Sequence, residues 1–463
     1  MLSSSSPQAD AAHDAAGDYV VKGAWFTLVV MIIMALVANV DRQMLVLAAA
    51  PLSQSLGLSD ARIGIIQGLP FAIFMIVAVY PIAWAADRFD RRWVFGICVL
   101  IWSLGTAACG LARNFEELFA AAVLIAAGEA SLVPVGIAFV PELFKGRKRL
   151  LANSIFYLFG FMGLAGGLIV SGAVMALADL VHADLPTSMQ ALESWRLAFF
   201  LVAAPTPIFL FLIAVSRLGH RSEPVAVNGQ QPPAKNHLWP YVRRHRRTVL
   251  TLFVGLSFYT LGVGGYFFFL PVATSRMFGT TPAQNGTLMG TATAIGLVLG
   301  VVIGTFINRR MTARIGPVAS IRLLWMAMLA GMPIFLIFPF VSASWQVFAL
   351  FGGIMFLVTA AGCALPGIMQ DMAPADLRGR VAAIGNIGNG IVNGIAPGMV
   401  GWISPYLGTD PRNLIVAMGI FAIPSWIIAA MLFRMAERPF ERTRLAAMAE
   451  AAADPISIES EQT

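Results

Sequence analysis

The chain contains twelve apolar runs that are each long enough to cross a lipid bilayer. A membrane-spanning helix needs about 20 mainly apolar residues, and inside hydrocarbon only helices or closed barrels satisfy their own backbone. The runs cover 24–50, 60–86, 93–112, 116–140, 150–179 and 194–216 in the first half, and 247–272, 284–307, 318–341, 344–368, 380–406 and 411–434 in the second. The sequence therefore predicts an all-α membrane protein with twelve transmembrane helices.

Charge and residue usage exclude several other classes of protein. Only 12% of the residues are charged, whereas soluble proteins carry about 25%. The net charge of +7 does not indicate nucleic-acid binding, because the basic residues recur in short clusters between apolar runs. The three cysteines lie within apolar runs and the five histidines lie outside them. We therefore expect no disulfide framework, no metal site and no cofactor.

A polar, basic linker at 217–246 divides the spans into six and six. We expect the other parts of the chain to be a disordered N-terminal tail at 1–22, one six-helix bundle at 23–216, a second bundle at 247–435 and a C-terminal tail at 436–463. The two halves repeat one pattern, since Arg149 precedes Gly163 at the same spacing at which Arg380 precedes Gly394. Two six-helix repeats joined by a linker are the plan of many secondary transporters.

The distribution of basic residues predicts the topology. If the N-terminus is cytoplasmic, the tails and even-numbered loops hold 25 of the 31 Lys and Arg residues, the odd-numbered loops hold 5, and Arg42 is the last. Basic residues concentrate in cytoplasmic loops. We therefore expect a multi-pass protein of the cell inner membrane, with both termini in the cytoplasm. We expect it to be a monomer in the bilayer.

Asp41 and Arg42 stand inside the first apolar run, close to Asn39, and Glu129 stands inside the fourth. A charged side chain at membrane depth costs a few kcal/mol or more, so such residues usually face a partner or a water-filled cavity and mark a functional site. The alternative for Asp41 and Arg42 is that they only extend to the headgroup level. The alternative for Glu129 is a protonated carboxyl with a structural role. We favour a polar functional core made of all three.

Further candidates for lining a cavity lie on other spans. Asn386, Asn389 and Asn393 share one face of the eleventh span, which predicts a polar surface there. The aromatic candidates are Tyr259 and Tyr266 on the seventh span and Tyr157 on the fifth. Aromatic residues at helical spacing are as often packed in a core as exposed in a cavity, and the sequence leaves that choice open.

The loop after the second span reads Asp87, Arg88, Phe89, Asp90, Arg91, Arg92. It resembles the corresponding loop of the major facilitator superfamily, with Ala83 and Asp90 standing where that family has glycine. The resemblance implies two pseudo-symmetric six-helix bundles around a central cavity. It also implies a cytoplasmic gate in which Arg88, Arg91 or Arg92 pairs with acids, Asp87 and Glu142 being the nearest candidates.

A narrower resemblance is to the Spinster branch of that superfamily, whose members transport lipids. It rests on Asn39, Asp41 and Arg42 in the first span and on Gly128 and Glu129 in the fourth. It implies an amphipathic substrate such as a lysolipid, moved together with or against protons. Desolvation raises the pKa of a carboxyl and a nearby cation lowers it, so we expect Asp41 and Glu129 to bind and release the coupled protons.

One position departs from the Spinster pattern. The family usually has an arginine two helical turns before the glutamate of the fourth span, and this chain has Ala122 there. Glu129 then lacks its expected fixed counter-charge, so we expect it to be protonated at neutral pH. Arg42 is the one intramembrane cation near the two acids, and it reaches either Glu129 or a ligand anion.

We interpret the chain as a proton-coupled secondary transporter that works by alternating access. An organic anion or a drug is the alternative substrate, with Arg42 facing a carboxylate. A transport-dead membrane sensor or scaffold is an alternative from another class. A membrane enzyme is disfavoured, because the sequence has no histidine-rich cluster and no nucleophile elbow.

Overall fold

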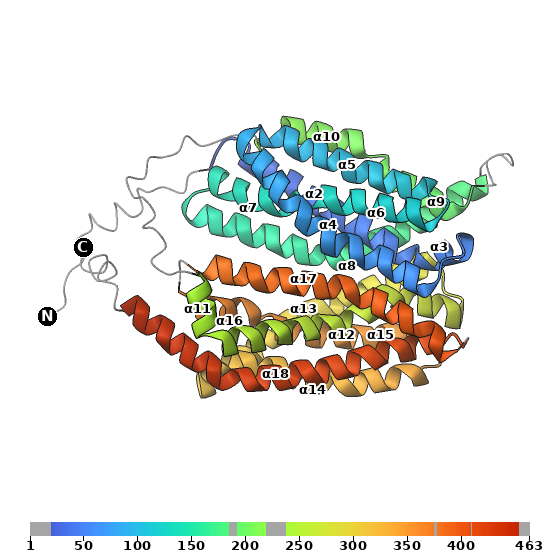
Figure 1. The fold of residues 1–463 in the computed structure, drawn as a ribbon. Helices are drawn as coiled ribbons and strands as arrows, with labels where there is room; N and C mark the ends of the chain where they lie inside the picture. The colour runs from blue at the N-terminus through green and yellow to red at the C-terminus, as the bar shows by residue number, and fades with distance from the viewer. Residues whose placement is uncertain (1–19, 185–191, 219–237, 375–376, 409, 453–463) are drawn as a thin grey trace. The chain divides into compact units, whose positions relative to one another are not determined.

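The computed structural model describes residues 20–184, 192–218, 238–374, 377–408 and 410–452 (Figure 1). These residues are helical apart from connecting turns and one isolated bridge between Val20 and Phe144. Every predicted apolar run lies on a helix or on two consecutive helices. Within the described residues, nine helices are long and apolar enough to cross a membrane, and α4 adds a tenth when its two parts, bent by 41°, are taken as one span. The chain is thus a helical multi-pass membrane protein.

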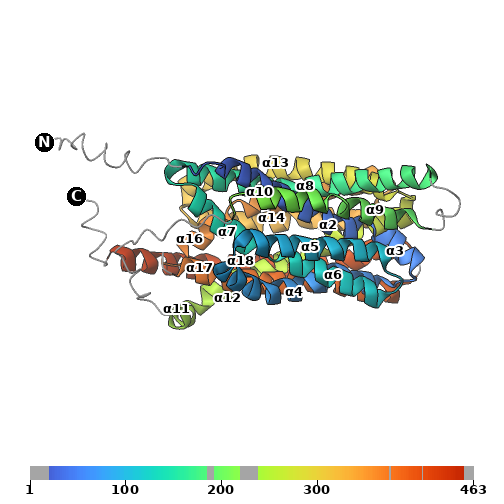
Figure 2. The same cartoon turned by 90° about the horizontal axis from the view of Figure 1, so that it is seen from above.

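The first six predicted spans form nine helices. They are α2 (Ala24–Leu47), α3 (Ala49–Ser55), α4 (Asp60–Arg88), α5 (Arg91–Leu111), α6 (Phe115–Glu129), α7 (Leu132–Leu143), α8 (Gly146–Asp184), α9 (Ser194–Ala203) and α10 (Thr206–Val215). The α9–α10 break lies beside Pro205, whose ring cannot continue the preceding hydrogen-bond ladder. By contrast α8, which is rich in glycine, is one unbroken helix (Figure 2).

The second half begins with a short helix and continues with the other six spans. Its elements are α11 (Leu238–Arg244), α12 (Arg246–Phe278), α13 (Pro282–Ile315), α14 (Val318–Ile337), η1 (Phe338–Phe340), α15 (Ser344–Gly362), α16 (Leu365–Asp371), α17 (Arg378–Ile403), η2 (Ser404–Leu407) and α18 (Asn413–Ala452). Thr281 and Gln284 form a reciprocal capping box at the start of α13, which fixes where this helix begins.

The ordered segments extend into regions expected to be tails or linker. The amide of Val21 donates to the carbonyl of Leu143 at 3.0 Å, so residues 20–22 are attached to the end of α7. At the other end α18 continues to Ala452, well past the predicted boundary of its bundle, and α11 lies within the expected linker. The remaining parts of these three segments, 1–19, 219–237 and 453–463, lie outside the described residues.

The chain forms two compact units whose boundaries differ from those expected from the linker. The first unit comprises the described parts of Met1–Met44 and Phe74–Val227, and the second comprises Leu45–Ile73 with the described part of Asn228–Thr463. The last residues of α2, all of α3 and the first half of α4 therefore pack with the helices of the second half.

The interior of the first unit is built from α2, α5, α7 and α10. Phe95 and Trp102 of α5 meet edge to face, with ring centroids 6.2 Å apart, and both are fully buried with Phe139 of α7. Helices in hydrocarbon gain little from burying apolar surface, so close packing and hydrogen bonds hold them together. This interior therefore fixes how α2 and α5 face each other.

The interior of the second unit is an aromatic cluster around Trp426 of α18. The indole N–H of Trp426 donates to the carbonyl of Tyr259 at 3.1 Å, and Tyr266 packs against Phe335 with ring centroids 5.1 Å apart. Gly262 leaves room for the indole, because a Cβ there would lie 2.4 Å from the Trp426 ring. Tyr259 and Tyr266 are both buried. In this structure they are packing residues, which decides the choice between core and cavity that the sequence left open.

A seam of small residues joins the first half of α4 to α17 in the second unit. A Cβ added at Gly68 would lie 1.9 Å from the carbonyl oxygen of Gly394, and one at Gly401 would lie 2.2 Å from the carbonyl oxygen of Asp60. Neighbouring backbones this close leave no space for a side chain. Gly394, which shares the spacing of the two repeats with Gly163, is therefore needed for close packing of α17 on α4.

We expect Gly68→Ala to lower the stability of the protein by about 1–3 kcal/mol, because the added methyl must push two backbones apart. Gly388→Ala is the matched control on α17, since a Cβ there meets nothing within 4 Å. Thermal unfolding of the purified protein measures the effect. Equal unfolding temperatures for Gly68→Ala and the parent would contradict the tight seam.

Candidate functional site

Asp41 of α2 lies inside the first unit and not at its surface. Its side chain is buried, and the hydroxyl of Thr106 on α5 donates to its Oδ1 at 2.7 Å. Thr106 has its own place in α5 fixed by a second contact of 3.1 Å to the Trp102 carbonyl. The acid is thus held by a neutral donor, which supports either protonation state better than a cation would.

Arg42 points to a different neighbour, Glu129 at the end of α6. Its Nη2 lies 2.9 Å from Oε2 of Glu129, and the two side chains are 36% and 2% exposed. The other carboxylate oxygen, Oε1, is buried without a hydrogen-bond partner among the described residues. The ion pair therefore has one accessible member and one buried member, and the buried acid is only partly satisfied.

Local sequence explains why Glu129 reaches this position. Gly128 packs directly on α5, where a Cβ would lie 2.5 Å from the carbonyl oxygen of Cys98 and 2.7 Å from the Cβ of Trp102. Any larger residue would separate α6 from α5. The helix then ends at Glu129, and the Ser131 hydroxyl donates to the Gly128 carbonyl at 2.8 Å across the break.

Contacts with α8 set the position of α2. Cβ atoms added at Gly163 and Gly167 would lie 2.7 Å and 3.0 Å from atoms of Asn39, and the Ser171 hydroxyl donates to the Val40 carbonyl at 3.0 Å. Asn39 itself donates back to the Ala35 carbonyl at 2.8 Å in its own helix. Asn39 is therefore a half-buried contact residue at the α2–α8 crossing. The side chain of Tyr157, also on α8, lies outside the described residues.

Ala122 stands where the Spinster pattern has an arginine, so the partner of Glu129 must come from elsewhere. Ala122 is fully buried in α6 and does not line an open cavity in this structure. Position 122 supplies no counter-charge, and Arg42 pairs with Glu129, which is one of the two partners expected for it. The reason is that Arg42 points away from Asp41, its neighbour in sequence, because successive helical residues differ by about 100°.

The loop between α4 and α5 forms ion pairs within the first unit. Arg91 pairs with Glu142 at the end of α7, and Arg92 pairs with Asp90 at 2.7 Å. The guanidinium of Arg88 lies 4.3 Å from the centre of the Trp84 ring. Asp87 is exposed at the end of α4.

Asp90 replaces the glycine of the family pattern without strain. Its φ of −62° and ψ of 120° are ordinary extended values, and its carboxylate accepts the Arg92 amide at 2.9 Å as the N-cap of α5. A left-handed backbone, which would require glycine, is therefore not used at this turn.

The three asparagines of α17 form a polar strip in the second unit. Asn386 and Asn393 are exposed and Asn389 is half-buried. The hydroxyl of Thr260 on α12 donates to Oδ1 of Asn389 at 2.6 Å. The strip keeps amide groups available on a helix that, after Arg380, is otherwise made of apolar and small residues.

Two polar clusters were missed by reading the sequence. Asp60 accepts two bonds from Arg276, at 2.9 Å and 2.6 Å, and a third from the Ser404 hydroxyl at 2.9 Å. Glu437 accepts from Arg322 and Trp325, with the indole bond at 2.7 Å. Their charges fall at span ends, where basic and acidic residues are common, so no sequence signal distinguished them from ordinary loop residues.

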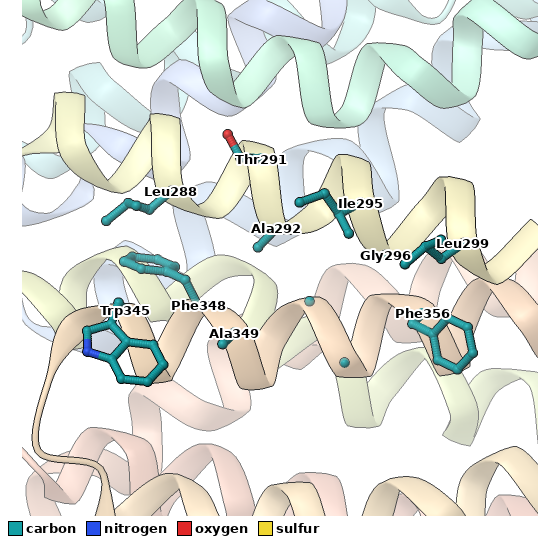
Figure 3. Close-up of a pocket in the computed structure, with 12 residues that line it drawn as sticks. Leu288, Thr291, Ala292, Ile295, Gly296, Leu299, Trp345, Phe348, Ala349 and Phe356 are labelled. Atoms are coloured by element: carbon teal, nitrogen blue, oxygen red, sulfur yellow. The ribbon is translucent and has the colours of Figure 1, made fainter.

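An apolar furrow of about 400 Å³ lies between α13 and α15 (Figure 3). Among its lining side chains only Thr291 and Trp345 carry polar atoms. A Cβ at Gly353, in its wall, would lie 3.4 Å from Ile334 of α14, whereas Phe351 on the other side of α15 contacts Phe267 of α12. The furrow is thus suited to a hydrocarbon chain and offers little to a charged headgroup.

Comparisons with known proteins agree with this architecture. A family model described as Major Facilitator Superfamily matches residues 31–397. An MFS-type efflux pump of Mycolicibacterium smegmatis is 24% identical over 448 residues, which are 95% of this chain and 98% of that protein. Protein spinster homolog 3 of Danio rerio is 25% identical over 297 residues, which are 60% of this chain and 56% of that protein.

A solved structure has a similar fold. It is that of a bacterial homologue of the human lysosomal transporter Spinster in an inward-facing and unoccupied conformation. The match has a TM-score of 0.73 at 20% identity and covers 92% of this chain and 98% of that one. At this level of identity the likeness establishes a shared fold.

Proposed function

The chain belongs to the Major Facilitator Superfamily and is a transporter, and from this premise we propose that it couples proton movement to transport of an amphipathic lipid such as a lysolipid. It works by alternating access around a site near the membrane midplane. The observation that carries the proposal is the ion pair between the accessible Arg42 and the buried Glu129, with the buried Asp41 beside Arg42 in sequence. Charged side chains at membrane depth are costly, and those that a membrane protein carries there usually serve its function.

The geometry of the pair suggests how substrate and proton are linked. Arg42 is about one third exposed, so an anionic headgroup can approach its guanidinium while Glu129 holds the other side. An anion that binds Arg42 competes with Glu129 for the same positive charge. A buried carboxylate that loses its partner takes up a proton from water in preference to remaining charged. Binding of the anion and protonation of Glu129 therefore favour each other.

The alternative substrate is an organic anion or a drug, and the similarity to an efflux pump supports this alternative. The alternative of another class is a sensor or scaffold without transport. A carboxylate would bind Arg42 as well as a phosphate does. The apolar furrow between α13 and α15, which lies within the second unit, supports a substrate with a hydrocarbon chain.

Liposomes that contain the purified protein test the proposal. We expect a labelled lysophospholipid to redistribute across the membrane faster than in protein-free liposomes, and faster again with an imposed pH difference. Acceleration of organic acids or drugs but not of the lysophospholipid would favour the alternative substrate. No accelerated movement of any of them in folded protein would favour the sensor or scaffold.

The proposed location is the inner membrane, with both termini in the cytoplasm, because the basic residues divide 25 to 5 between the two sets of loops. Reporters that are active only in the cytoplasm, fused to each terminus, measure this. A silent reporter at either end of a well-expressed fusion would contradict the assignment.

A further inference from the structure

We infer that the polar strip on α17, made of Asn386, Asn389 and Asn393, is a hydrogen-bond-donor subsite for the phosphodiester headgroup of the substrate. This inference rests on the proposed function, because it concerns the same substrate. The contacts that support it all lie within the second unit.

The strip does not face lipid. The exposed isoleucines Ile387, Ile391 and Ile395 form a row on another side of α17, which is the side suited to hydrocarbon. A carboxamide left without partners in hydrocarbon costs several kcal/mol, so exposed asparagines at membrane depth must face water or a polar ligand. The strip therefore lines a polar space.

Contacts on both flanks of the strip confirm its direction within the second unit. On one flank Gly385 and Ala396 face α12, where a Cβ at Gly385 would lie 2.5 Å from Phe253. On the other flank Gly394 and Gly401 face the first half of α4. By helical angle the asparagines lie between these two packed sides, opposite the isoleucine row. The space they line is bordered by α12 and α4.

The partner of Asn389 determines which polar atoms it presents. Thr260 donates to its Oδ1 at 2.6 Å, and this is the shortest contact of the Thr260 hydroxyl. With the oxygen engaged, the two N–H bonds of the amide remain for a ligand. Gly264 of α12 makes room for Asn393, since a Cβ there would lie 3.1 Å from its Oδ1. The strip thus offers N–H donors to acceptor oxygens.

The length of the strip narrows the class of ligand. Residues 386 to 393 rise by about 10 Å along a helix, which exceeds the size of a single carboxylate. A phosphodiester with its flanking ester or glycerol oxygens spans such a distance and presents only acceptors at its centre. A cationic headgroup without phosphate has no acceptor to offer these donors.

Two detergents with the same chain test the inference. Dodecylphosphocholine carries a phosphodiester and a quaternary ammonium, whereas dodecyltrimethylammonium carries the ammonium alone. We expect the parent to bind dodecylphosphocholine more tightly, as measured by displacement of a fluorescent lipid in a neutral maltoside detergent. Asn386→Ala and Asn393→Ala should each weaken that affinity about tenfold or more, because each variant loses a hydrogen bond to the charged phosphodiester.

Three further variants make the result specific. Asn389→Asp keeps the shape but replaces the donors by a negative charge, so it should weaken the phosphodiester ligand and strengthen the cationic one. Thr260→Val removes the group that orients Asn389 and should weaken the phosphodiester ligand alone. Ile391→Ala, in the lipid-facing row of the same helix, is the matched control and should change neither affinity. Thermal unfolding without ligand confirms that every variant is folded.

The pattern of affinities tests the donor subsite and the lipid substrate separately. If the amide variants lose affinity for both detergents equally, or for neither, the donor subsite is overturned while the proposed lipid function stands. If the parent itself does not prefer dodecylphosphocholine, both the subsite and the lipid substrate are overturned. Selective loss of the phosphodiester ligand supports both.

Discussion

Glu129→Gln is expected to abolish the dependence of transport on a pH difference while leaving the protein folded. Glutamine keeps an oxygen that can accept from Arg42, so the contact between α2 and α6 survives, but an amide cannot take up and release a proton. A pH difference of one unit corresponds to about 1.4 kcal/mol, or roughly tenfold accumulation for each coupled proton. The parent should approach that ratio, and Glu129→Gln should only equilibrate the substrate.

The control for this substitution lies on the same helix. Glu116 is exposed in the first turn of α6, so Glu116→Gln should accumulate substrate like the parent. Accumulation is measured with a labelled substrate in liposomes over a series of imposed pH differences. A Glu129→Gln curve that overlays the parent's would show that the proton site lies elsewhere.

Asp41→Asn separates the roles of the two acids. Asparagine can still accept the Thr106 hydroxyl, so its structural contact is retained. If both acids couple protons, Asp41→Asn should abolish the pH dependence as Glu129→Gln does. If it transports with the parent's pH dependence, Glu129 is the proton site and Asp41 only positions α2 against α5.

The helices were predictable from the sequence because hydrocarbon leaves the backbone few choices. Every helix of the described residues that is long and apolar enough to cross a membrane lies on a predicted apolar run, and the cost of intramembrane charge directed attention to Asp41 and Glu129. The break after Glu129 also has a sequence signal. Pro134 lacks the N–H that would bond the Ala130 carbonyl, and a proline ring clashes with the carbonyl four residues before it, so the helix is interrupted at this point as it is at Pro205.

The sequence alone did not predict which side chains of distant helices contact each other. Helix geometry indicated that Arg42 need not pair with Asp41, but its partner Glu129 depended on how α2 and α6 pack together. Tyr259 and Tyr266 show the same limit. Their spacing fits a core or a cavity equally well, and the deciding feature was the space that Gly262 and Gly331 leave for Trp426.

The substitution of Arg276 by glutamate is expected to destabilise the end of the second unit where α4 begins. Asp60 is buried to a side-chain exposure of 10%, and Arg276 is 32% exposed. Breaking a buried ion pair costs about 3–5 kcal/mol and an exposed one at most about 1 kcal/mol, so an intermediate loss of about 2 kcal/mol is expected for this partly exposed pair. The Ser404 hydroxyl alone cannot balance two facing carboxylates.

The charge swap provides the decisive comparison. Asp60→Arg combined with Arg276→Glu restores opposite charges, so the double variant should recover a large part of the stability that either single variant loses. Arg412→Glu, an exposed basic residue near η2, should behave like the parent. Thermal unfolding measures the stability of all five proteins. A double variant as unstable as the worse single variant would show that the positions matter for shape and not for their charges.

The same variants also test whether the Asp60–Arg276 ion pair affects the outward opening expected of the transporter. On the proposed topology Asp60, Arg276 and Ser404 lie at the outer ends of α4, α12 and α17, and the glycine seam continues inward from them. If the proposed alternating access moves the first half of α4 away from α12 and α17, outward opening separates these contacts. Arg276→Glu should therefore lengthen the distance between spin labels at positions 54 and 406, both exposed in the second unit, and the charge swap should shorten it again. Unchanged distances in Arg276→Glu would mean that the glycine seam holds this end closed without the ion pair.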